Sequence, residues 1–352
     1  MKILLFVDKL FGGGAERVAS NLLNHLCKKH NVKAIIFNDK LPTYPLNPQI
    51  QIQKITVDCK IRILHPFERM HKIRESIKQN NPDLIISFMV SLNMYIAIAN
   101  CNTHKKLILS EHTTMQARQT LFEWLTRHTL YRFASKVVLV TKSDYNFANW
   151  LENKAFIYNP LSYPITTSHY EREKTIIAIS SLRRWHIKGF DMLIKAWAKI
   201  APFHPDWKLH FVGTNDDDII SNMARNYNIE NQVVFEGWVN DIDRIMRNGS
   251  IFVLSSRQEG FPCSLIEAMS QGCACVAFDC KTGPNEIITN GVNGLLANNG
   301  DIDDLSSKLQ SLIEDDNLRK QIANNAIKDV QQFDGTRIMN DWDNLIDEIT
   351  AK

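Results

Sequence analysis

The sequence predicts an α/β protein built from two doubly wound domains. Short apolar runs rich in β-branched residues alternate with segments of helical periodicity, which is typical of parallel sheets with crossover helices. The length of 352 residues exceeds what one hydrophobic core usually organises. A stretch with two prolines and no periodicity, residues 159–173, separates two series of expected strands. We therefore place the domain boundaries at 1–165 and 166–335.

Each half supplies its own strands and helices. A helix from about Ala15 to Lys29 is expected after the first strand, because its apolar residues form one stripe. The expected strands of the first half are 2–7, 32–37, 83–88, 106–110, 136–140 and 155–158. Those of the second half are 175–180, 208–213, 232–237, 250–256, 274–279 and 294–297. Ligands of such folds bind beyond the carboxyl ends of the strands.

The composition excludes several classes of protein. A hydrophobic content of 44% and a charged content of 22% are ordinary for a globular chain. Seven irregularly spaced cysteines indicate reduced thiols in a cytosol rather than a disulfide framework or a zinc site. The N-terminal apolar run is too short for a secretory signal. The uncharged run 84–100 contains polar residues, so we expect a buried strand and a buried helix rather than a membrane span.

Charge is divided unequally along the chain. Residues 1–165 hold 22 Lys and Arg against 11 Asp and Glu, whereas residues 166–352 hold 19 against 27. The first half therefore favours an anionic surface or substrate. A chance excess of solvated charges is the alternative.

The segment 255–272, SSRQEGFPCSLIEAMSQG, carries the strongest functional signal. A strand runs into a loop, and a helix then starts near Pro262 and stops at Gly272. The helix start, with Ser264 in its first turn, favours a phosphate because its N–H groups are free. Glu259 and Glu267 bracket that start, and carboxylates accept hydrogen bonds from sugar and ribose hydroxyls.

Glu259 and Glu267, with seven residues between them, resemble the E-x7-E motif of glycosyltransferase family 4. The flanks FVLSS, TGPNEII and NGVNGLL are similar to the family as well, as are GGGAERVASNLL (12–23), SEHT (110–113) and SLRRWHIKGFDMLIKAW (181–197). The resemblance covers essentially the whole chain. It implies the GT-B fold, with two Rossmann-like domains facing across a cleft and a C-terminal helix (336–352) returning to the N-terminal domain. It also implies a retaining transfer from a nucleotide-sugar, by family frequency a UDP-sugar.

The resemblance implies roles for donor-site residues. Glu259 would contact the donor sugar and Glu267 the ribose, while Arg183 and Lys188 would hold the diphosphate. The loop and helix start would add further donor contacts, from Phe261, Pro262, Ser264 and Leu265. The family often reads Gly-Arg-Leu before the lysine, whereas this chain reads Ser-Leu-Arg-Arg at 181–184. Arg184 is therefore the alternative phosphate ligand.

Two further segments belong to the first half. Gly12, Gly13 and Gly14 follow a strand, but the third position of a dinucleotide fingerprint holds Arg17, which argues against a dinucleotide site. By resemblance, Gly13 and Gly14 approach the donor and Gly12 the acceptor side; a simple tight turn is the alternative.

The sequence SEHT places a second pair of polar residues after the strand 106–110. His112 corresponds to a family position that contacts the donor sugar, and a structural histidine is the alternative. Glu111, on the acceptor side, is expected to position the loop rather than act as a base.

We predict no metal and no other cofactor. The pair D-x-D, typical of a metal-dependent glycosyltransferase fold, starts at Asp216, Asp241, Asp301 and Asp341. A pattern found four times does not discriminate, and the arginine and lysine side chains can neutralise the diphosphate instead.

The acceptor is expected to be a glycan on a polyprenyl diphosphate, because GGGAERV and SEHT resemble the branch of the family that assembles O-antigen, capsule and lipid-linked oligosaccharides. The segments 64–80 and 121–136 mix basic and apolar residues, so either could lie on an anionic membrane, although packing on the domain's own sheet is the alternative. We expect a cytoplasmic protein, peripheral on the inner face of the cytoplasmic membrane, without a nucleic-acid partner.

Two other functions remain open at this point. A GT-B nucleotide-sugar epimerase or phosphorylase would share the architecture, and a non-enzymatic lipid- or nucleotide-binding module would lack turnover. The sequence leaves open the nucleotide base, the sugar, the acceptor and the linkage.

Overall fold

The computed structural model describes residues 1–38, 40–58, 65–166, 171–180, 184–213, 218–239 and 241–351. The chain divides into two compact units. Unit 1 comprises Met1–Ser162 together with Gly335–Lys352, and unit 2 comprises Tyr163–Asp334. The division falls within the proline-containing stretch 159–173, a few residues before the expected position.

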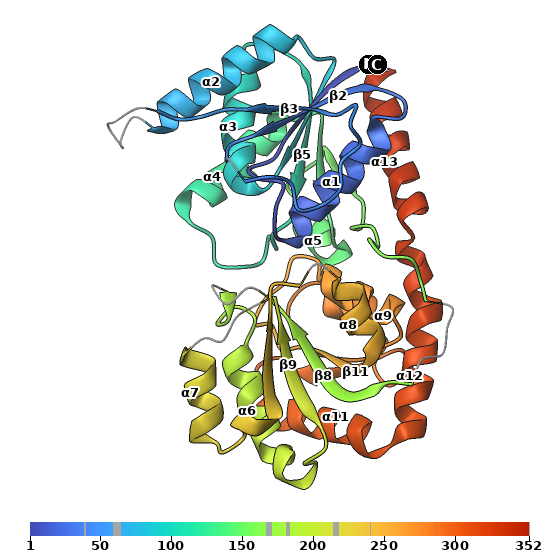
Figure 1. The fold of residues 1–352 in the computed structure, drawn as a ribbon. Coiled ribbons are helices and arrows are strands. Elements are labelled where there is room, and N and C mark those ends of the chain that lie inside the picture. Colours follow the sequence, from blue (N-terminus) through green and yellow to red (C-terminus); the bar gives the residue numbers. More distant parts are fainter. Residues whose placement is uncertain are drawn as a thin grey trace. The chain divides into compact units, whose positions relative to one another are not determined.

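A parallel sheet forms the centre of unit 1 (Figure 1). Its described strands are β1 (Lys2–Phe6), β2 (Asn31–Ile36), β3 (Gln51–Lys54), β4 (Leu84–Phe88), β5 (Lys106–Glu111), β6 (Lys136–Leu139) and β7 (Lys154–Phe156). They follow the spatial order β3-β2-β1-β4-β5-β6-β7. The order reverses between β1 and β4, where Phe6 pairs with Ser87. Such a reversal opens a crevice at the carboxyl ends, so the loops after β1 and β4 can hold a ligand.

Helices cover this sheet, with α2 and α3 on one side and α1 and α13 on the other (Figure 1). The described helices are α1 (Gly14–Leu26), α2 (His65–Asn80), α3 (Val90–Asn100), α4 (Leu121–His128), the 3₁₀ helix η2 (Leu130–Phe133), α5 (Lys142–Phe147) and α13 (Gly335–Thr350). Helix α13 is tied to α1 and to the turn that follows it, because Asp343 lies 3.0 Å from His25 of α1 and accepts from Lys29 of the turn at 2.6 Å. The expected return of the last helix to the first domain is confirmed.

Unit 2 repeats the doubly wound arrangement. Its described strands are β8 (Glu173–Ile179), β9 (Lys208–Val212), β10 (Val233–Gly237), β11 (Gly249–Leu254), β12 (Ala274–Asp279) and β13 (Leu295–Asn298). They are parallel and follow the order β10-β9-β8-β11-β12-β13. The order reverses between β8 and β11, which places the loops after these two strands at the ligand-binding edge.

The helices of unit 2 cover both faces of its sheet, with α6 and α7 on one side and α8 and α9 on the other (Figure 1). They are α6 (Phe190–Ile200), η4 (Ala201–Phe203), α7 (Asp218–Asn226), η5 (Glu230–Gln232), α8 (Ile242–Asn248), α9 (Cys263–Ser270), α10 (Pro284–Ile287), α11 (Ile302–Glu314), α12 (Asp316–Asp329) and η6 (Val330–Phe333). Two parallel-sheet units of this kind confirm the predicted fold class.

The structure also shows what the uncharged run 84–100 forms. It forms the buried strand β4 and the helix α3, as expected. Within the described residues, no helix combines the length and the apolar content that crossing a bilayer requires. One described strand of the sheet was missed in the sequence: β3, an edge strand with the sequence QIQK, lacks the apolar run that marks its neighbours.

Candidate donor site and family membership

The loop after β11 leads directly into α9, as the motif predicts. Pro262 precedes the first turn of α9, and in the described chain no side chain caps that turn. The helix ends before Gly272, whose φ of +79° suits a helix stop. Two first-turn N–H groups are already engaged, because Cys263 donates to the Phe261 carbonyl at 3.0 Å and Leu265 to the Pro262 carbonyl at 2.9 Å. The start of α9 still lies at the carboxyl edge of the unit 2 sheet, next to the strand reversal, where the helix dipole favours a negative charge.

Glu259 and Lys188, two of the charged residues expected at the donor, form an ion pair. The Lys188 Nζ lies 2.7 Å from the Glu259 Oε1, and their side chains are only 16% and 10% exposed. Ser256 donates a second hydrogen bond to the same oxygen, at 2.6 Å. Thr282 Oγ1 donates to the main-chain carbonyl of Glu259. The structure thus brings the two residues together from distant points of the sequence and holds the glutamate in one orientation.

Lys188 is carried by a turn that lies directly against the end of β11. Ser255 Oγ donates to the Lys188 carbonyl at 2.8 Å. The next residue, Gly189, has a φ of +66°, and a Cβ there would lie 1.9 Å from the Ser255 carbonyl oxygen. Only glycine fits this close approach of backbone to backbone, so Gly189 sets the position of the lysine.

A second ion pair clamps the same turn. Arg257 donates two hydrogen bonds to the carboxylate of Asp191, at 2.8 and 2.7 Å, and another to the carbonyl of His186. Its own N–H donates to the Ile187 carbonyl at 2.9 Å. Burial acts to raise the pKa of Asp191, but the hydrogen bonds and charge of Arg257 outweigh it and lower that pKa. We call Arg257 and Asp191 the loop clamp.

The other predicted donor residues of α9 and its approach are largely buried. Glu267 lies about a turn inside α9 and is 5% exposed. Phe261 packs edge-on against Phe333, and Leu265 is fully buried. Contacts of Phe261 and Leu265 with a donor stay a prediction. Ser264 is half-buried in the first turn of the helix.

Of the two arginines in the segment 181–184, one lies within the described residues. Arg183 lies outside the described residues. Arg184 is described and exposed, at the start of the turn that carries Lys188. Which of the two would hold a diphosphate stays open.

In unit 1, the glycine loop follows β1 and starts α1. Gly12 has a φ of +95°, and Gly13 precedes the first turn of α1, which no side chain of the described residues caps. Tyr44 Oη donates to the Gly12 carbonyl. A Cβ on Gly13 would lie 2.7 Å from the Glu16 carboxylate, while Gly14 begins the helix. The loop therefore lies at the strand reversal, and its contact with donor or acceptor stays a prediction.

His112 lies at the same edge, just beyond β5. Its ring stacks on Phe88 with centroids 4.8 Å apart, and its Nε2 lies 3.0 Å from Ser110 Oγ. Its Nδ1 is buried and has no hydrogen-bond partner in the described structure. Burial lowers the pKa of His112 to about 3, so the ring is neutral at physiological pH. It can act as a hydrogen-bonding group, and it does not act as a cation.

Glu111 is buried in a polar network. Arg127 donates to its Oε2 at 3.1 Å, and Tyr131 donates to the same oxygen at 2.7 Å. The Thr113 N–H donates to its Oε1 at 3.2 Å. With 1% exposure, Glu111 joins β5 to the helix α4 and η2. This geometry supports the expectation that Glu111 positions the loop that carries His112.

The D-x-D pairs have local structural roles where they are described. Asp301 caps α11, and Asp343 pairs with Lys29 and His25. Asp243 pairs with Arg247 at 2.6 Å. Asp216 and Asp217 lie outside the described residues, directly before α7. Among the residues that the structure describes, no three His, Cys, Asp or Glu side chains gather in a metal-binding group.

Sequence reasoning missed four residues that position Lys188 and Glu259: Ser255, Ser256, Asp191 and Arg257. All lie inside the segments that it singled out. No spacing rule identifies them, because their importance comes from contacts between the turn after β8 and the loop after β11.

Two family models match the chain. The Glycosyltransferase Family 4 model matches residues 12–176, and the Glycosyl transferases group 1 model matches residues 164–329. A Campylobacter jejuni α-1,4-N-acetyl-D-galactosaminyltransferase, named for a GalNAc-GalNAc-diNAcBac-PP-undecaprenol substrate, is 26% identical over 364 residues, which covers 99% of each chain. A lipopolysaccharide 1,6-galactosyltransferase of Salmonella typhimurium is 25% identical over 338 residues, 89% of this chain and 90% of the relative.

Solved structures show the same architecture. Anabaena HepE in complex with UDP and glucose matches with a TM-score of 0.83 at 21% identity, over 99% of this chain and 100% of that one. The apo form of the lipopolysaccharide outer core galactosyltransferase WaaB matches with a TM-score of 0.75 at 21% identity, over 98% and 99%. At this identity the likeness shows the fold. Because the two family models together run from residue 12 to residue 329 and the relatives span nearly the whole chain, this protein belongs to the family 4, group 1 glycosyltransferases of the GT-B fold.

Proposed function

We propose that this glycosyltransferase moves a hexose or an N-acetylhexosamine from a UDP-sugar to a glycan on a polyprenyl diphosphate, with retention at the anomeric carbon, in the assembly of a surface polysaccharide or oligosaccharide. The observation that carries the donor half is the Lys188–Glu259 pair beside the start of α9. It provides a cation for a diphosphate and a carboxylate for a sugar. Support for UDP comes from HepE, which was solved with UDP and glucose.

In the proposed reaction, Lys188 turns from Glu259 to the diphosphate of the donor, and Glu259 then accepts hydrogen bonds from sugar hydroxyls. When the glycosidic bond breaks, its electron pair goes to the departing phosphate oxygen, whose new negative charge Lys188 stabilises. The acceptor hydroxyl attacks the anomeric carbon from the face of the sugar that the phosphate leaves. The departing phosphate oxygen takes its proton. Neutral His112 orients the sugar through a hydrogen bond.

We further propose that the transfer needs no metal ion. Charge-assisted hydrogen bonds contribute about 1.5–3 kcal/mol each, and Lys188, Arg183 or Arg184, and the α9 N-terminus could together offset the diphosphate charge. A diphosphate neutralised in this way needs no metal ion, and therefore no cluster of carboxylates to bind one.

The acceptor proposal rests on the relatives. The Campylobacter enzyme is named for an undecaprenol-linked substrate, and the Salmonella enzyme for lipopolysaccharide. An acceptor with a polyprenyl chain resides in a bilayer, so a peripheral association of this protein with the inner face of the cytoplasmic membrane follows from the proposal.

Calorimetric titration with UDP, GDP and ADP in EDTA tests the donor site. We expect UDP to bind, and Lys188→Ala and Glu267→Ala to weaken binding on the order of tenfold or more. Lys195→Ala, on the neighbouring helix α6, is the matched control and should bind like the wild type. Absence of nucleotide binding by a folded sample would refute the proposal. Conversion of a UDP-sugar to its epimer without an acceptor would instead identify an epimerase, and turnover that consumes free phosphate would identify a phosphorylase.

A further inference from the structure

Helix α4 of unit 1 buries its polar side and exposes its apolar side, the reverse of an ordinary surface helix. Its two buried residues are polar, Thr126 at 1% and Arg127 at 2% exposure. Its large apolar residues are exposed instead: Leu121, Phe122, Trp124 and Leu125. A helix that packs on its own domain shows the opposite pattern. For α4 itself, the alternative of ordinary packing of its apolar side on the sheet therefore does not hold, whereas Tyr131 and Ala134 of the same segment are buried in the unit 1 core.

The reversed helix is firmly held in place. Thr120 and Glu123 form a reciprocal capping box at its start. Arg127 anchors its last turn through the buried Glu111, at 3.1 Å. Its outward apolar side is thus the outcome of a specific polar core and not of a loosely attached segment.

Neighbouring elements extend the apolar surface. A row of stacked and edge-on rings runs from Trp124 through His128 and Trp150 to Phe147, with centroid separations of 4.6, 4.4 and 5.6 Å. Phe147, on α5, is exposed, as is Phe133 on η2. We name the exposed apolar residues of α4, η2 and α5 the α4 surface; its members are Leu121, Phe122, Trp124, Leu125, Phe133 and Phe147.

Helix α2, the other basic segment that the sequence suggested, packs in the ordinary way. Its Ile73 and Ile77 are fully buried in the unit 1 core. Phe67 is its one large exposed apolar side chain among the described residues. The structure therefore separates two segments that look alike in sequence.

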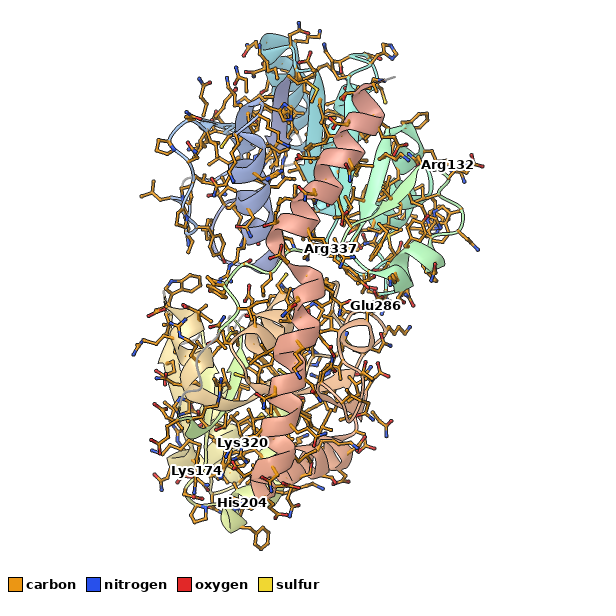
Figure 2. The ribbon with its side chains drawn as sticks, turned by 90° about the vertical axis from the view of Figure 1, so that its right-hand side faces the viewer. Arg132, Lys174, His204, Glu286, Lys320 and Arg337 are labelled. Carbon is orange, nitrogen blue, oxygen red and sulfur yellow. The ribbon has the colours of Figure 1, made fainter. Side chains whose placement is uncertain are left out.

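Charge around the α4 surface favours an anionic partner. Three exposed cations lie close to it in the chain: Arg118 just before α4, Arg132 next to Phe133, and Lys142 at the start of α5. Arg132 extends outward from unit 1 in Figure 2. The acidic residue Glu123 is engaged in the capping box. Exposed Trp, Phe and Leu side chains with a basic rim are the combination that inserts at the interface of a bilayer.

We propose that the α4 surface docks on an anionic phospholipid bilayer, with Leu121, Phe122, Trp124 and Phe133 inserted below the headgroups and the three cations at the phosphates. This inference rests on the lipid-linked acceptor proposed above, and it assigns the membrane contact to one face of unit 1. A fixed surface of this kind brings the protein to the plane in which a polyprenyl-linked acceptor lies.

Flotation of the full chain with phosphatidylglycerol-containing vesicles tests the proposal. We expect wild-type protein to float with these vesicles and far less with pure phosphatidylcholine. The variant Phe122→Ser/Phe133→Ser should lower the partition coefficient on the order of tenfold or more. Phe67→Ser, which replaces a phenylalanine 64% exposed against 69% for Phe122, is the matched control and should float like the wild type.

The outcomes separate this inference from the proposed function. Unchanged flotation of the double variant, or an equal loss for Phe67→Ser, would overturn the α4 surface as the membrane contact. If the double variant instead converts a dimer to a monomer in sedimentation without losing flotation, the surface joins two copies of the chain and the proposal is wrong. UDP titration of the same variants reports the donor site independently, since Phe67, Phe122 and Phe133 are not among the residues expected to contact the donor.

Discussion

The loop clamp should control how well the protein binds its donor, although neither clamp residue is expected to contact it. The perturbation is Asp191→Asn, which keeps the shape of the side chain and removes its charge. In the wild type, two charge-assisted hydrogen bonds at 2.8 and 2.7 Å tie the loop after β11 to α6; in the variant Arg257 keeps at most one, to the neutral amide oxygen. The turn that carries Lys188 lies between them and is held by the same arginine through His186.

The size of the effect follows from the geometry and the burial. A hydrogen bond to a charged group contributes about 1.5–3 kcal/mol, and a solvent-exposed ion pair only about 0–1 kcal/mol. The clamp is bidentate and its side chains are 32% and 17% exposed, so an intermediate loss of about 1.5–2 kcal/mol is reasonable. If that free energy keeps the turn in its binding position, the Kd for UDP rises about 10- to 30-fold.

Calorimetric titration of UDP into wild type, Asp191→Asn and Asp206→Asn measures this. Asp206 pairs with exposed Lys174 elsewhere in unit 2, so its replacement removes an ion pair without touching the turn and should leave the Kd unchanged. The maximal rate at saturating donor should fall less than kcat/KM does. A wild-type Kd for Asp191→Asn, together with a lowered Tm, would show that the clamp only stabilises the fold.

Two further predictions concern buried carboxylates of unit 1. Burial raises the pKa of Asp144 to about 6, above its ordinary value near 3.8, so the folded state favours the neutral form and the wild type loses stability as pH rises between these values. Asp144→Asn should therefore be more stable than the wild type by about 3 kcal/mol at pH 8 and by little at pH 4, measured by urea unfolding. A difference in stability that does not change with pH would contradict the assignment. Glu111→Gln leaves the Arg127 charge buried without its partner and should cost about 3–5 kcal/mol, also by urea unfolding. Recovery in Glu111→Gln/Arg127→Met would confirm that cause, and an equally unstable double variant would refute it.

The sequence by itself determined the fold class, nearly all of the strands and the family. Strands of a parallel sheet are buried on both faces, so they read as continuous apolar runs, and the motif around Glu259 and Glu267 has fixed local spacing. The edge strand β3 was missed for the same reason, because exposed residues carry no such pattern.

Tertiary structure alone decided which residues act together. The Lys188–Glu259 pair and the loop clamp join segments about 70 residues apart, and only the strand reversal between β8 and β11 brings their loops together. The sequence also does not show which face of α4 is buried. Its apolar stripe predicts burial, but the buried charge of Glu111 attracts Arg127 inward and turns that stripe to the outside. Periodicity shows that a helix has two faces, whereas the partner available in the core decides which face is buried.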